Sequence, residues 1–431
     1  MRNLRDKFLK IGVIADDLTG ANDTGVQFRK SGLTTICLVG IPKRETPPEA
    51  DAIVLDTESR NKPRDEARRL ASQAATALKD MGARLFYKKI DSTMRGNIGV
   101  EIEAIMDALG VNTTILTPAY PARGRVVMRG HLLVHGVPLE ETEYSTGMPA
   151  GPQSLQTLLG ASITRPSTHV DIETVLRGGK RIASEIAQKI SADGGIFTID
   201  ASSRSDLAAI AWAAHKLGMR FICGSAGLAE EIPYAYGLVK SVGPVLAVVG
   251  SPSPTSIKQL NEASRTPNVA AVNLDASKLF LGKKTSAVEA ERVTDQLANY
   301  LKRKVDSVLS SARSEADLDA PLSAGLRKGL TETEVRTRVA QSLSKIVITV
   351  IEESPVSGLF VTGGETAVHI LKALQAEGTE IIKEISPGIP VVKLQGGKFA
   401  GLNVVTKAGG FGDDYSIVDA IRYLRTGSDP N

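Results

Sequence analysis

Short apolar segments recur throughout the chain, and each is bounded by Gly, Pro or Asp and followed by a stretch with helical periodicity. Strands that alternate with helices form parallel sheets, because each helix carries the chain back across the sheet before the next strand begins. Asp65–Met81 and Gly99–Leu109 are typical of such helices. The clearest strands in the first half read KIGVIADD, TTICLVG, DAIVLDT, RLFYKKID and TTILTPAY. The sequence therefore predicts an α/β protein with mainly parallel sheets flanked by helices.

A length of 431 residues allows two or three domains, each long enough to bury its own core. A second series of strands opens with VLAVVGS, directly after the turn-like segment Ser241–Pro244, and continues through VAAVNLD, GLFVTGG, IPVVKLQGG and NVVTKAGG. Thr285–Leu309 and Thr331–Glu353 have helical patterns with mixed charge and are predicted to cover this second sheet. We therefore expect two domains, residues 1–243 and 244–431.

The segment Gly124–Ser154 interrupts the alternating pattern of the first domain, because it is rich in Gly, Pro, Glu and Thr. We interpret it as a long excursion from that domain, with a β-hairpin through HLLVHGVPL. Loops of this length usually have a function or contact a partner.

The charge balance argues against a nucleic-acid surface. Fifty-two Lys and Arg and 48 Asp and Glu leave a formal charge of +4, without long charged blocks and with only 4% aromatic residues.

No apolar run approaches the ~20 residues of a membrane helix, and Ile11–Ala15 is too short for a signal-peptide core. Cys37 and Cys223 lie far apart in predicted strands, which favours buried thiols over a disulfide. We expect a cytoplasmic protein that binds small molecules but neither nucleic acid nor membrane, and that is compatible with homo-oligomerisation.

The first strand ends directly in Asp16 and Asp17, with Asp23 a few residues beyond. Ligands of open α/β sheets gather at this end of the strands. Carboxylates there can accept hydrogen bonds from a polyol, act as a general base, or hold Mg²⁺. Asp17 or Asp23 could instead merely cap the next helix. We favour a functional role for the adjacent Asp16–Asp17 pair, because placing two like charges side by side costs free energy unless a function requires them. For Asp23, both a functional role and helix capping stay open.

A second polar cluster follows the strand RLFYKKID. Lys88 and Lys89 must point to opposite faces of an extended strand, so at most one of them faces a given pocket. Asp91–Arg95 looks like a polar cup for an anion that bears hydroxyl groups. The alternative is an ion-paired helix cap with Ser92 or Thr93 as the N-cap residue.

Arg60 follows the strand DAIVLD and adds a second fixed cation, whose planar fork matches the two oxygens of a carboxylate. A single arginine in a loop does not by itself indicate a binding site. Three strand ends with polar side chains of matching type predict one site for a small, hydroxylated, negatively charged molecule.

Glycine-containing turns follow three strands of the second half, at Gly250–Thr255, Thr362–Ala367 and Lys407–Gly412. Glycine lets backbone N–H groups approach phosphate oxygens, and the start of a following helix adds a favourable dipole, although glycine also serves plain tight turns. Neither GxxxxGK[ST] nor GxGxxG after a strand occurs, which argues against a P-loop enzyme and a standard dinucleotide-binding protein. The turns therefore predict an unconventional nucleotide site.

Six strings, in this order along nearly the whole chain, resemble the four-carbon acid-sugar kinase family: IADDLTGANDTGVQF, YKKIDSTMRGN, PAYPARGR, GSPSPTSIKQL, LFVTGGETA and VVTKAGGFG. Members are ATP-dependent kinases with an N-terminal substrate-binding and a C-terminal nucleotide-binding domain, and they phosphorylate O4 of D-threonate, D-erythronate or 3-oxo-tetronate. The resemblance implies an active site in the cleft between the domains. It implies substrate contacts at Asp16, Arg60, Lys88, Lys89, Ile90 and Asp91. It implies nucleotide contacts at Ser251, Ser253, Thr362, Gly363, Gly364, Glu365, Gly409, Gly410 and Phe411.

Leu18 and Asn22 make the first string more similar to the D-threonate and D-erythronate kinases than to the 3-oxo-tetronate branch, which has Phe and Thr there. We therefore expect D-threonate as the acceptor, with D-erythronate and 3-oxo-tetronate as alternatives.

The implied reaction is in-line phosphoryl transfer from MgATP, in which catalysis is mostly positioning and charge stabilisation. Arg60 and one of Lys88 and Lys89 would neutralise the substrate carboxylate, and Asp16 would orient or deprotonate the reacting hydroxyl. Asp17 or Asp91 could compete for that role or serve Mg²⁺, and the metal ligands stay unassigned. The alternatives are a non-catalytic sugar-acid sensor, which needs no second set of glycine turns, and a hydroxy-acid dehydrogenase, which needs the missing dinucleotide fingerprint.

Overall fold

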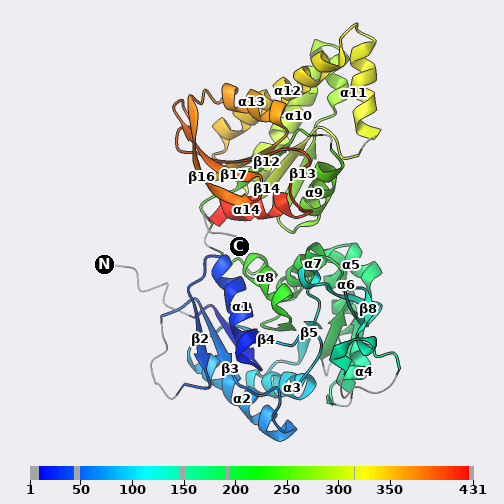
Figure 1. The fold of residues 1–431 in the computed structure, drawn as a ribbon, viewed down its shortest axis with the longest axis vertical. Coiled ribbons are helices and arrows are strands. Elements are labelled where there is room, and N and C mark those ends of the chain that lie inside the picture. The colour runs from blue at the N-terminus through cyan, green and yellow to red at the C-terminus, as the bar shows by residue number, and fades with distance from the viewer. Residues whose placement is uncertain are drawn as a thin grey trace. The chain divides into compact units, whose positions relative to one another are not determined.

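The computed structural model divides into two compact units, Met1–Lys240 and Ser241–Asn431, which are described here one at a time (Figure 1). The residues that it describes are 9–42, 49–145, 151–160, 162–190, 194–239, 241–251, 253–314 and 316–426. Within these residues, no helix is both long and apolar enough to cross a membrane.

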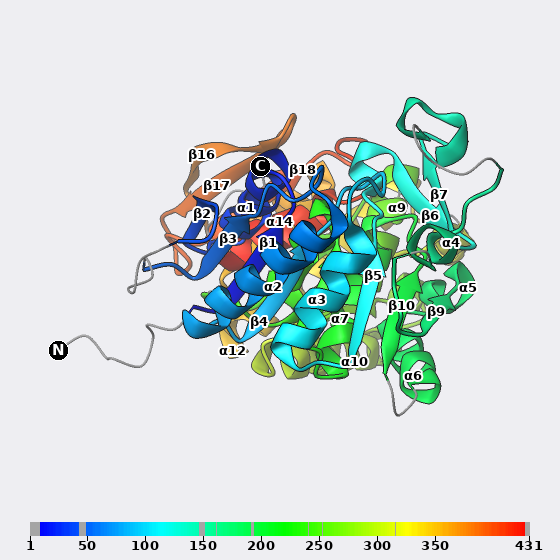
Figure 2. The same ribbon diagram turned by 90° about the horizontal axis from the view of Figure 1, so that it is seen from below.

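Unit 1 is built on an eight-stranded sheet with the order β2-β3-β1-β4-β11-β5-β10-β9, in which every neighbouring pair is parallel (Figure 2). The central strands are buried on both faces, as the continuous apolar runs predicted. The strands are β1 Ile11–Ala15, β2 Thr35–Val39, β3 Ala52–Asp56, β4 Leu85–Lys89, β5 Thr113–Thr117, β9 Ser167–Val170, β10 Gly195–Ile199 and β11 Phe221–Gly224.

Helices cover both faces of this sheet. Helices α2 and α3 pack side by side on one face, whereas α1, α8, α7 and α6 form a row on the other (Figure 1). The helices are α1 Leu18–Lys30, α2 Arg64–Asp80, α3 Ile98–Leu109, α4 Leu155–Gly160, α5 Ile172–Leu176, α6 Gly179–Lys189, α7 Arg204–Lys216 and α8 Ala226–Ala235. The two helices predicted at Asp65–Met81 and Gly99–Leu109 are thereby confirmed as α2 and α3.

The excursion after β5 contains a small antiparallel sheet of β6 Arg125–Met128, β7 His131–Val134 and β8 Val137–Pro138, so the predicted hairpin is confirmed. The buried carboxylate of Asp200, at the end of β10, accepts hydrogen bonds from the backbone N–H groups of Arg129 and Gly130. These hydrogen bonds anchor the small sheet beside the carboxyl end of β10, near the β9 edge of the large sheet (Figure 2). Residues 146–150 of the predicted excursion lie outside the described residues.

Unit 2 has a seven-stranded sheet with the order β13-β14-β12-β15-β18-β17-β16, in which β16 and β17 run antiparallel to their neighbours and the other pairs are parallel. The strands are β12 Val245–Val249, β13 Val269–Asn273, β14 Asp306–Ser310, β15 Gly358–Thr362, β16 Gly378–Ser386, β17 Ile389–Gln395 and β18 Asn403–Lys407. The prediction of α/β domains with mainly parallel sheets is confirmed for both units.

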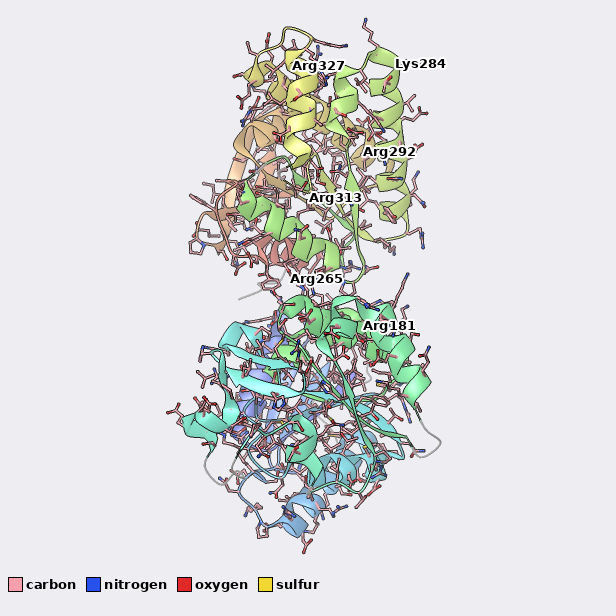
Figure 3. All side chains as sticks on the ribbon, turned by 90° about the vertical axis from the view of Figure 1, so that its right-hand side faces the viewer. Arg181, Arg265, Lys284, Arg292, Arg313 and Arg327 are labelled. Atoms are coloured by element: carbon pink, nitrogen blue, oxygen red, sulfur yellow. The ribbon has the colours of Figure 1, made fainter. Side chains whose placement is uncertain are left out.

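The sheet of unit 2 separates two apolar cores, one under α10, α12 and α13 and one under α9 and α14. The helices are α9 Pro254–Arg265, α10 Lys283–Lys302, α11 Ala316–Leu326, α12 Glu332–Glu353, α13 Gly364–Ala373 and α14 Ser416–Thr426. At the outer edge of β13, Arg292 and Arg313 donate hydrogen bonds to the carbonyls of Asn273 and Ala271, at 2.8 and 3.1 Å (Figure 3). These arginines cover an edge that would otherwise be open to pairing with another strand.

One predicted helix in this unit is too long. The helical pattern at Thr285–Leu309 ends at Lys302, and Asp306–Leu309 belongs to the buried strand β14. The backbone of Lys304 takes the left-handed conformation, with φ of 58°, which cannot continue a right-handed helix. The helix predicted at Thr331–Glu353 is confirmed as α12, and Thr331 and Glu334 form a capping box at its start.

Both cysteines are free thiols, which excludes the disulfide alternative. Cys223 in β11 is buried as expected, whereas Cys37 in β2 is partly exposed.

Candidate active site

The loops that follow β1, β3 and β4 leave the sheet of unit 1 at the same edge. Ala15 is in register with Asp56 on one side and with Lys89 on the other, so the residues after these strands are neighbours in space. Asp16 and Asp91, which follow β1 and β4, are both buried. The strand ends that the sequence singled out therefore form one site.

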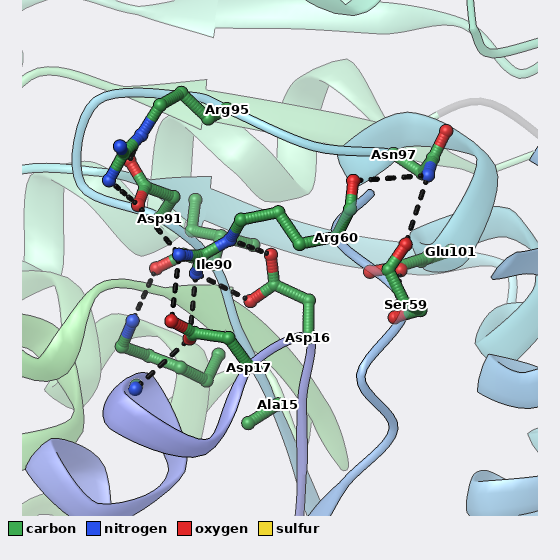
Figure 4. Close-up of polar contacts among 12 residues, drawn as sticks. Ala15, Asp16, Asp17, Ser59, Arg60, Ile90, Asp91, Arg95, Asn97 and Glu101 are labelled. Carbon is green, nitrogen blue, oxygen red and sulfur yellow. Dashed lines mark hydrogen bonds and ion pairs between the residues drawn. The ribbon is translucent and has the colours of Figure 1, made fainter. Parts of the chain in front are cut away.

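Arg60 lies at the centre of this site, between three carboxylates (Figure 4). Its guanidinium binds both oxygens of Asp16, from Nε at 2.7 Å and from Nη2 at 3.0 Å. It also binds both oxygens of Asp17, at 2.8 and 2.7 Å, and its Nη1 lies 3.4 Å from Oδ2 of Asp91. The fork of Arg60 is thus already occupied by protein carboxylates, so a substrate carboxylate would have to exchange with one of them.

The pKa of Asp16 is lowered. Burial opposes its ionisation, but the charges of Lys88 and Arg60 and the hydrogen bond from Arg60 outweigh the burial. Burial acts the same way on Asp91, but hydrogen bonds from Arg95 and Thr93 and the charge of Arg60 lower its pKa to about 2. Asp16 and Asp91 are therefore ionised acceptors at neutral pH.

Lys88 and Lys89 point to opposite faces of β4, as predicted. Nζ of Lys88 lies 2.6 Å from a carboxylate oxygen of Glu101 on α3, and both side chains are only 1% exposed. Lys89 is on the side of the aspartates and donates to the carbonyl of Ile90 at 2.8 Å, while the Ile90 side chain is buried. Burial lowers the pKa of Lys89, although the aspartates counteract this effect. Of the two lysines, Lys89 is the one that faces the aspartates.

Of the residues that could have capped a helix, the structure shows one in that role and places the others elsewhere. Asp17 is the N-cap residue of α1 and accepts a hydrogen bond from the N–H of Gly20 at 3.0 Å, so it combines capping with its contact to Arg60. Asp23 lies inside α1, so capping by Asp23 is wrong. Capping by Ser92 or Thr93 is also wrong, because α3 begins only at Ile98. Thr93 donates instead to Asp91.

The sequence prediction missed Asn97, which fixes the loop that carries Arg60. Its side-chain amide donates to the carbonyls of Ser59 and Lys62, at 3.1 and 2.9 Å. Gly96, with φ of 96°, lets the two loops approach, because a Cβ there would lie 3.2 Å from both Arg60 and Asp16. The Gly-Asn pair in STMRGN was the only signal in the sequence for this contact.

The excursion reaches the same site through Tyr144, in the short 3₁₀ helix Glu143–Ser145. The Tyr144 ring stacks against the guanidinium groups of Arg95 and Arg125, at 5.7 and 5.8 Å from its centroid. Arg95 in turn donates to Oδ2 of Asp91 at 2.7 Å. The excursion therefore helps to hold a cation, 52% exposed, beside the aspartates.

Unit 2 contains a cavity of about 360 Å³ at the point where its three glycine turns meet. One wall is apolar, from Ala276, Pro321, Leu322, Val335, Val339 and Ala340, and another is formed by the glycine turns. Such a cavity is in the size range of small-molecule sites. Five of the residues expected to contact a nucleotide line it, namely Ser251, Gly363, Gly364, Glu365 and Gly409.

The other expected residues belong to the same turns but do not line the cavity. Thr362 is buried as the last residue of β15, and Ser253 caps α9 and donates to the carbonyl of Gly409 at 2.7 Å. Phe411 is 53% exposed. A Cβ at 409 would lie 2.0 Å from the Ser251 hydroxyl oxygen, so the Ser251 side chain would have to move to admit one.

Among the described residues, no group of three or more His, Cys, Asp or Glu is arranged to hold a metal ion. Asp317, Asp319, Glu332 and Glu365 line the cavity and offer the oxygen ligands that Mg²⁺ prefers. The Mg²⁺ ligands stay unassigned.

Comparisons with known proteins agree with this division into two units. A family model for a sugar-binding N-terminal domain matches residues 11–232, and one for a nucleotide-binding C-terminal domain matches residues 246–417. The chain is 34% identical over 425 residues to the D-threonate kinase of Salmonella typhimurium, covering 96% of this chain and 98% of that protein. The chain belongs to the four-carbon acid sugar kinase family. The resemblance in the sequence is thereby confirmed, and the sensor and dehydrogenase alternatives are not supported.

Relatives of this four-carbon acid sugar kinase are named for different acids. The D-erythronate kinase of Heliobacterium modesticaldum is 32% identical, with 96% of this chain and 97% of that protein covered. A crystal structure from Bordetella bronchiseptica, a domain-swapped dimer with bound citrate, has a TM-score of 0.63 at 29% identity, with 96% of this chain and 98% of that chain covered. The 3-oxo-tetronate kinase of Pseudomonas fluorescens is 29% identical, with 93% of this chain and 94% of that protein covered. These identities are too similar to select one acid.

Proposed function

We propose that this four-carbon acid sugar kinase transfers the γ-phosphoryl group of ATP to O4 of D-threonate, with D-erythronate and 3-oxo-tetronate as the alternative acceptors. The observation that carries the proposal is the cluster of three aspartates around Arg60, which offers both acceptors for hydroxyl groups and cations for a carboxylate. The D-threonate kinase at 34% identity supports the choice of acid.

The charges of the cluster suit a sugar acid. The negative charges of Asp16, Asp17 and Asp91 are matched by Arg60, Lys89 and Arg95, which lie among them. Ionised carboxylates accept hydrogen bonds from hydroxyl groups, and arginine binds a carboxylate through its fork. We assign substrate contacts to Asp16, Arg60, Lys89 and Asp91 through their side chains and to Ile90 through its backbone. Lys88 takes part through its charge beside Asp16, because it is buried against Glu101.

Asp16 is the residue that we assign to the reacting hydroxyl. Because its pKa is below the ordinary value, Asp16 is ionised and ready to accept a hydrogen bond from that hydroxyl. A carboxylate of low pKa is a weak base, so it orients the hydroxyl and takes the proton late, when the bond to phosphorus is forming. Asp17 and Asp91 are the alternative residues for this step.

We assign the nucleotide to the cavity of unit 2, with its base against the apolar wall and its phosphates at the glycine turns. The start of α13 at Gly364 and the turn at Gly409 border the same cavity, and both positions suit an anion. Ser251, Gly363, Gly364, Glu365 and Gly409 would contact the nucleotide. The other residues expected to do so belong to the same turns but do not line the cavity, namely Ser253, Thr362, Gly410 and Phe411. Mg²⁺, when bound to ATP, would neutralise charge on the transferred phosphoryl group.

A coupled assay of ADP release tests the proposal with D-threonate, D-erythronate and 3-oxo-tetronate, each compared with a reaction without acid. We expect turnover with at least one acid and the highest kcat/KM with D-threonate. ADP release that never exceeds the acid-free rate would contradict the proposed reaction. A higher kcat/KM for another of the three acids would retain the reaction and change the acceptor.

The possible homo-oligomeric state also stays a proposal, supported by the domain-swapped dimer of the Bordetella bronchiseptica protein. Light scattering on the purified chain measures its mass directly. A monomeric mass at enzyme-assay concentrations would contradict this expectation.

A further inference from the structure

A buried lysine lies directly behind the glycine turn that follows β18. Lys407 is 4% exposed, and its Nζ donates to the carbonyls of Ala408, Gly409 and Phe411, at 2.8, 3.1 and 3.0 Å. No carboxylate of the described residues forms an ion pair with it. The ammonium group is therefore met by three carbonyl dipoles of a single turn, an arrangement that makes the turn's conformation depend on this side chain.

Three side chains from α9 and its N-cap donate hydrogen bonds to two of the same carbonyls. Ser253 and Ser256 donate to the carbonyl of Gly409, at 2.7 and 3.0 Å, and Gln259 donates to the carbonyl of Phe411 at 3.0 Å. Their spacing of three residues places them on one face of the helix. We call these four side chains, Lys407, Ser253, Ser256 and Gln259, the carbonyl clamp.

The clamp also determines where the amide groups of the turn point. In a trans peptide unit the C=O and the N–H point in opposite directions, and the described residues contain no cis peptide. The N–H groups of Gly409, Gly410 and Gly412 share their peptide units with the three clamped carbonyls, so they point away from Lys407. None of these three N–H groups has a hydrogen-bond partner among the described residues.

Backbone N–H groups that follow one another in a turn can form a concave site for an anion. Gly409 lines the cavity of unit 2, so this turn borders the place where we expect the nucleotide. The space beside Gly410 is open, since a Cβ built there would have nothing within 4 Å.

We propose that the carbonyl clamp, with Lys407 as its centre, is a set of positioning residues that turns the amides of Gly409, Gly410 and Gly412 toward the phosphates of the bound nucleotide. This inference rests on the proposed function. In this arrangement Ser253 acts on the turn rather than on the nucleotide, and Lys407 adds positive charge behind the turn without touching the ligand.

The test uses the difference between a nucleotide that has phosphates and one that has none. Isothermal titration measures the Kd of ADP and of adenosine for the unmodified chain, Lys407→Met, Lys407→Arg and Lys345→Met, in which an exposed lysine of α12 is the matched control. Ser256→Ala is a milder variant, because it removes one donor and keeps the lysine. Thermal melting and circular dichroism show whether each variant is folded.

We expect Lys407→Met to weaken ADP binding at least tenfold and to change adenosine binding less than twofold. Lys407→Arg should recover part of the loss, Ser256→Ala should weaken ADP binding by a few-fold, and Lys345→Met should match the unmodified chain. If Lys407→Met does not fold, the Ser256→Ala result decides in its place.

Two results would overturn the inference while leaving the proposed function intact. One is ADP binding that stays within twofold of the unmodified chain in both Lys407→Met and Ser256→Ala. The other is an equal loss for ADP and adenosine, which indicates a general collapse of the cavity. An unmodified chain that binds no ADP would overturn the proposed function, and the role of the clamp with it.

Discussion

In unit 1, a single arginine partly balances the charges of a cluster of three aspartates. Carboxylates at 16, 17 and 91 repel one another, and the positive charge of Arg60 offsets this repulsion because Arg60 lies within ion-pair distance of all three. The strand-end rule predicted the aspartates themselves. It could not predict that Arg60 would join them, because that contact depends on the loop conformation set by Gly96 and Asn97.

Asp16→Asn should lower kcat by about 100-fold or more, the usual effect of losing an acid–base group. An amide cannot accept the proton of the reacting hydroxyl, although it still accepts a hydrogen bond. The KM for ATP should stay within about twofold of that of the unmodified enzyme, since Asp16 lies in unit 1. Steady-state ADP release measures both values. Asp80→Asn, at the exposed end of α2, is the control for a neutralised aspartate and should retain normal kcat. Near-normal kcat in Asp16→Asn would remove Asp16 from the reaction.

The pH dependence of nucleotide binding should report on Lys407. Burial lowers the pKa of Lys407 to about 8, so the ammonium form is present below this pH and is lost above it. The neutral amine has two donors for three carbonyls and no charge, so the Kd of ADP should rise as pH increases through about 8. Titration of ADP between pH 7 and 9.5 measures this effect. Lys407→Arg stays charged over the range and should show a flatter profile. Parallel profiles of the two proteins would assign the effect to another group.

At the scale of elements, β4 is tied to α3 by the ion pair of Lys88 and Glu101. Burial lowers the pKa of Lys88, but the charges of Glu101 and Asp16 outweigh this, so its pKa is raised and it stays charged. The side-chain alternation of a strand predicted that the two lysines separate. The sequence did not indicate Glu101 as the partner, because it lies on α3, beyond the loop.

Glu101→Gln should destabilise the protein by about 3–5 kcal/mol, because it leaves the Lys88 charge buried without its partner. Urea denaturation followed by circular dichroism measures the free energy of unfolding. The double variant Lys88→Met/Glu101→Leu removes both charges and should recover most of the loss. A loss below about 1 kcal/mol in Glu101→Gln would mean that water or another group solvates Lys88.

Tyr144→Ala tests whether the excursion serves the sugar-acid site. Removing the ring frees Arg95 and Arg125 from contacts worth ~0.5–1 kcal/mol each, so the KM for the sugar acid should rise about fivefold. The KM for ATP should not change. Tyr144→Phe keeps the ring and should remain close to the unmodified enzyme. Equal effects of the two substitutions would contradict a role for the stacked ring.

The strands and helices differ in how clearly the sequence predicts them. β1 is a continuous apolar run and is buried at every position, so it was predicted directly. β14, with the sequence DSVLS, is equally buried but begins with Asp306, which pairs with Arg425 on α14. A partner more than a hundred positions away leaves no local pattern. For this reason the sequence pattern predicts the end of a helix where the structure has β14.

At the scale of the whole molecule, each unit has its own sheet and its own apolar cores. The two series of strand and helix patterns were sufficient to predict this, because periodicity reports burial along the chain. The meeting of three glycine turns around one cavity depends on strand order, β12 beside β15 and β15 beside β18. That order is a property of the fold, and the clamp behind the third turn involves backbone carbonyls that carry no sequence signal.

The most direct test of the proposed reaction is the ³¹P NMR spectrum of the product formed from ATP and D-threonate. A phosphate ester at O4 is bonded to a CH₂ group, so its phosphorus signal is predicted to be split into an apparent triplet by the two protons of that group. The same triplet with D-erythronate or 3-oxo-tetronate would retain the reaction for those acids. A doublet, which arises from a secondary hydroxyl, would contradict transfer to O4, and the absence of any ester signal with all three acids would contradict the kinase reaction itself.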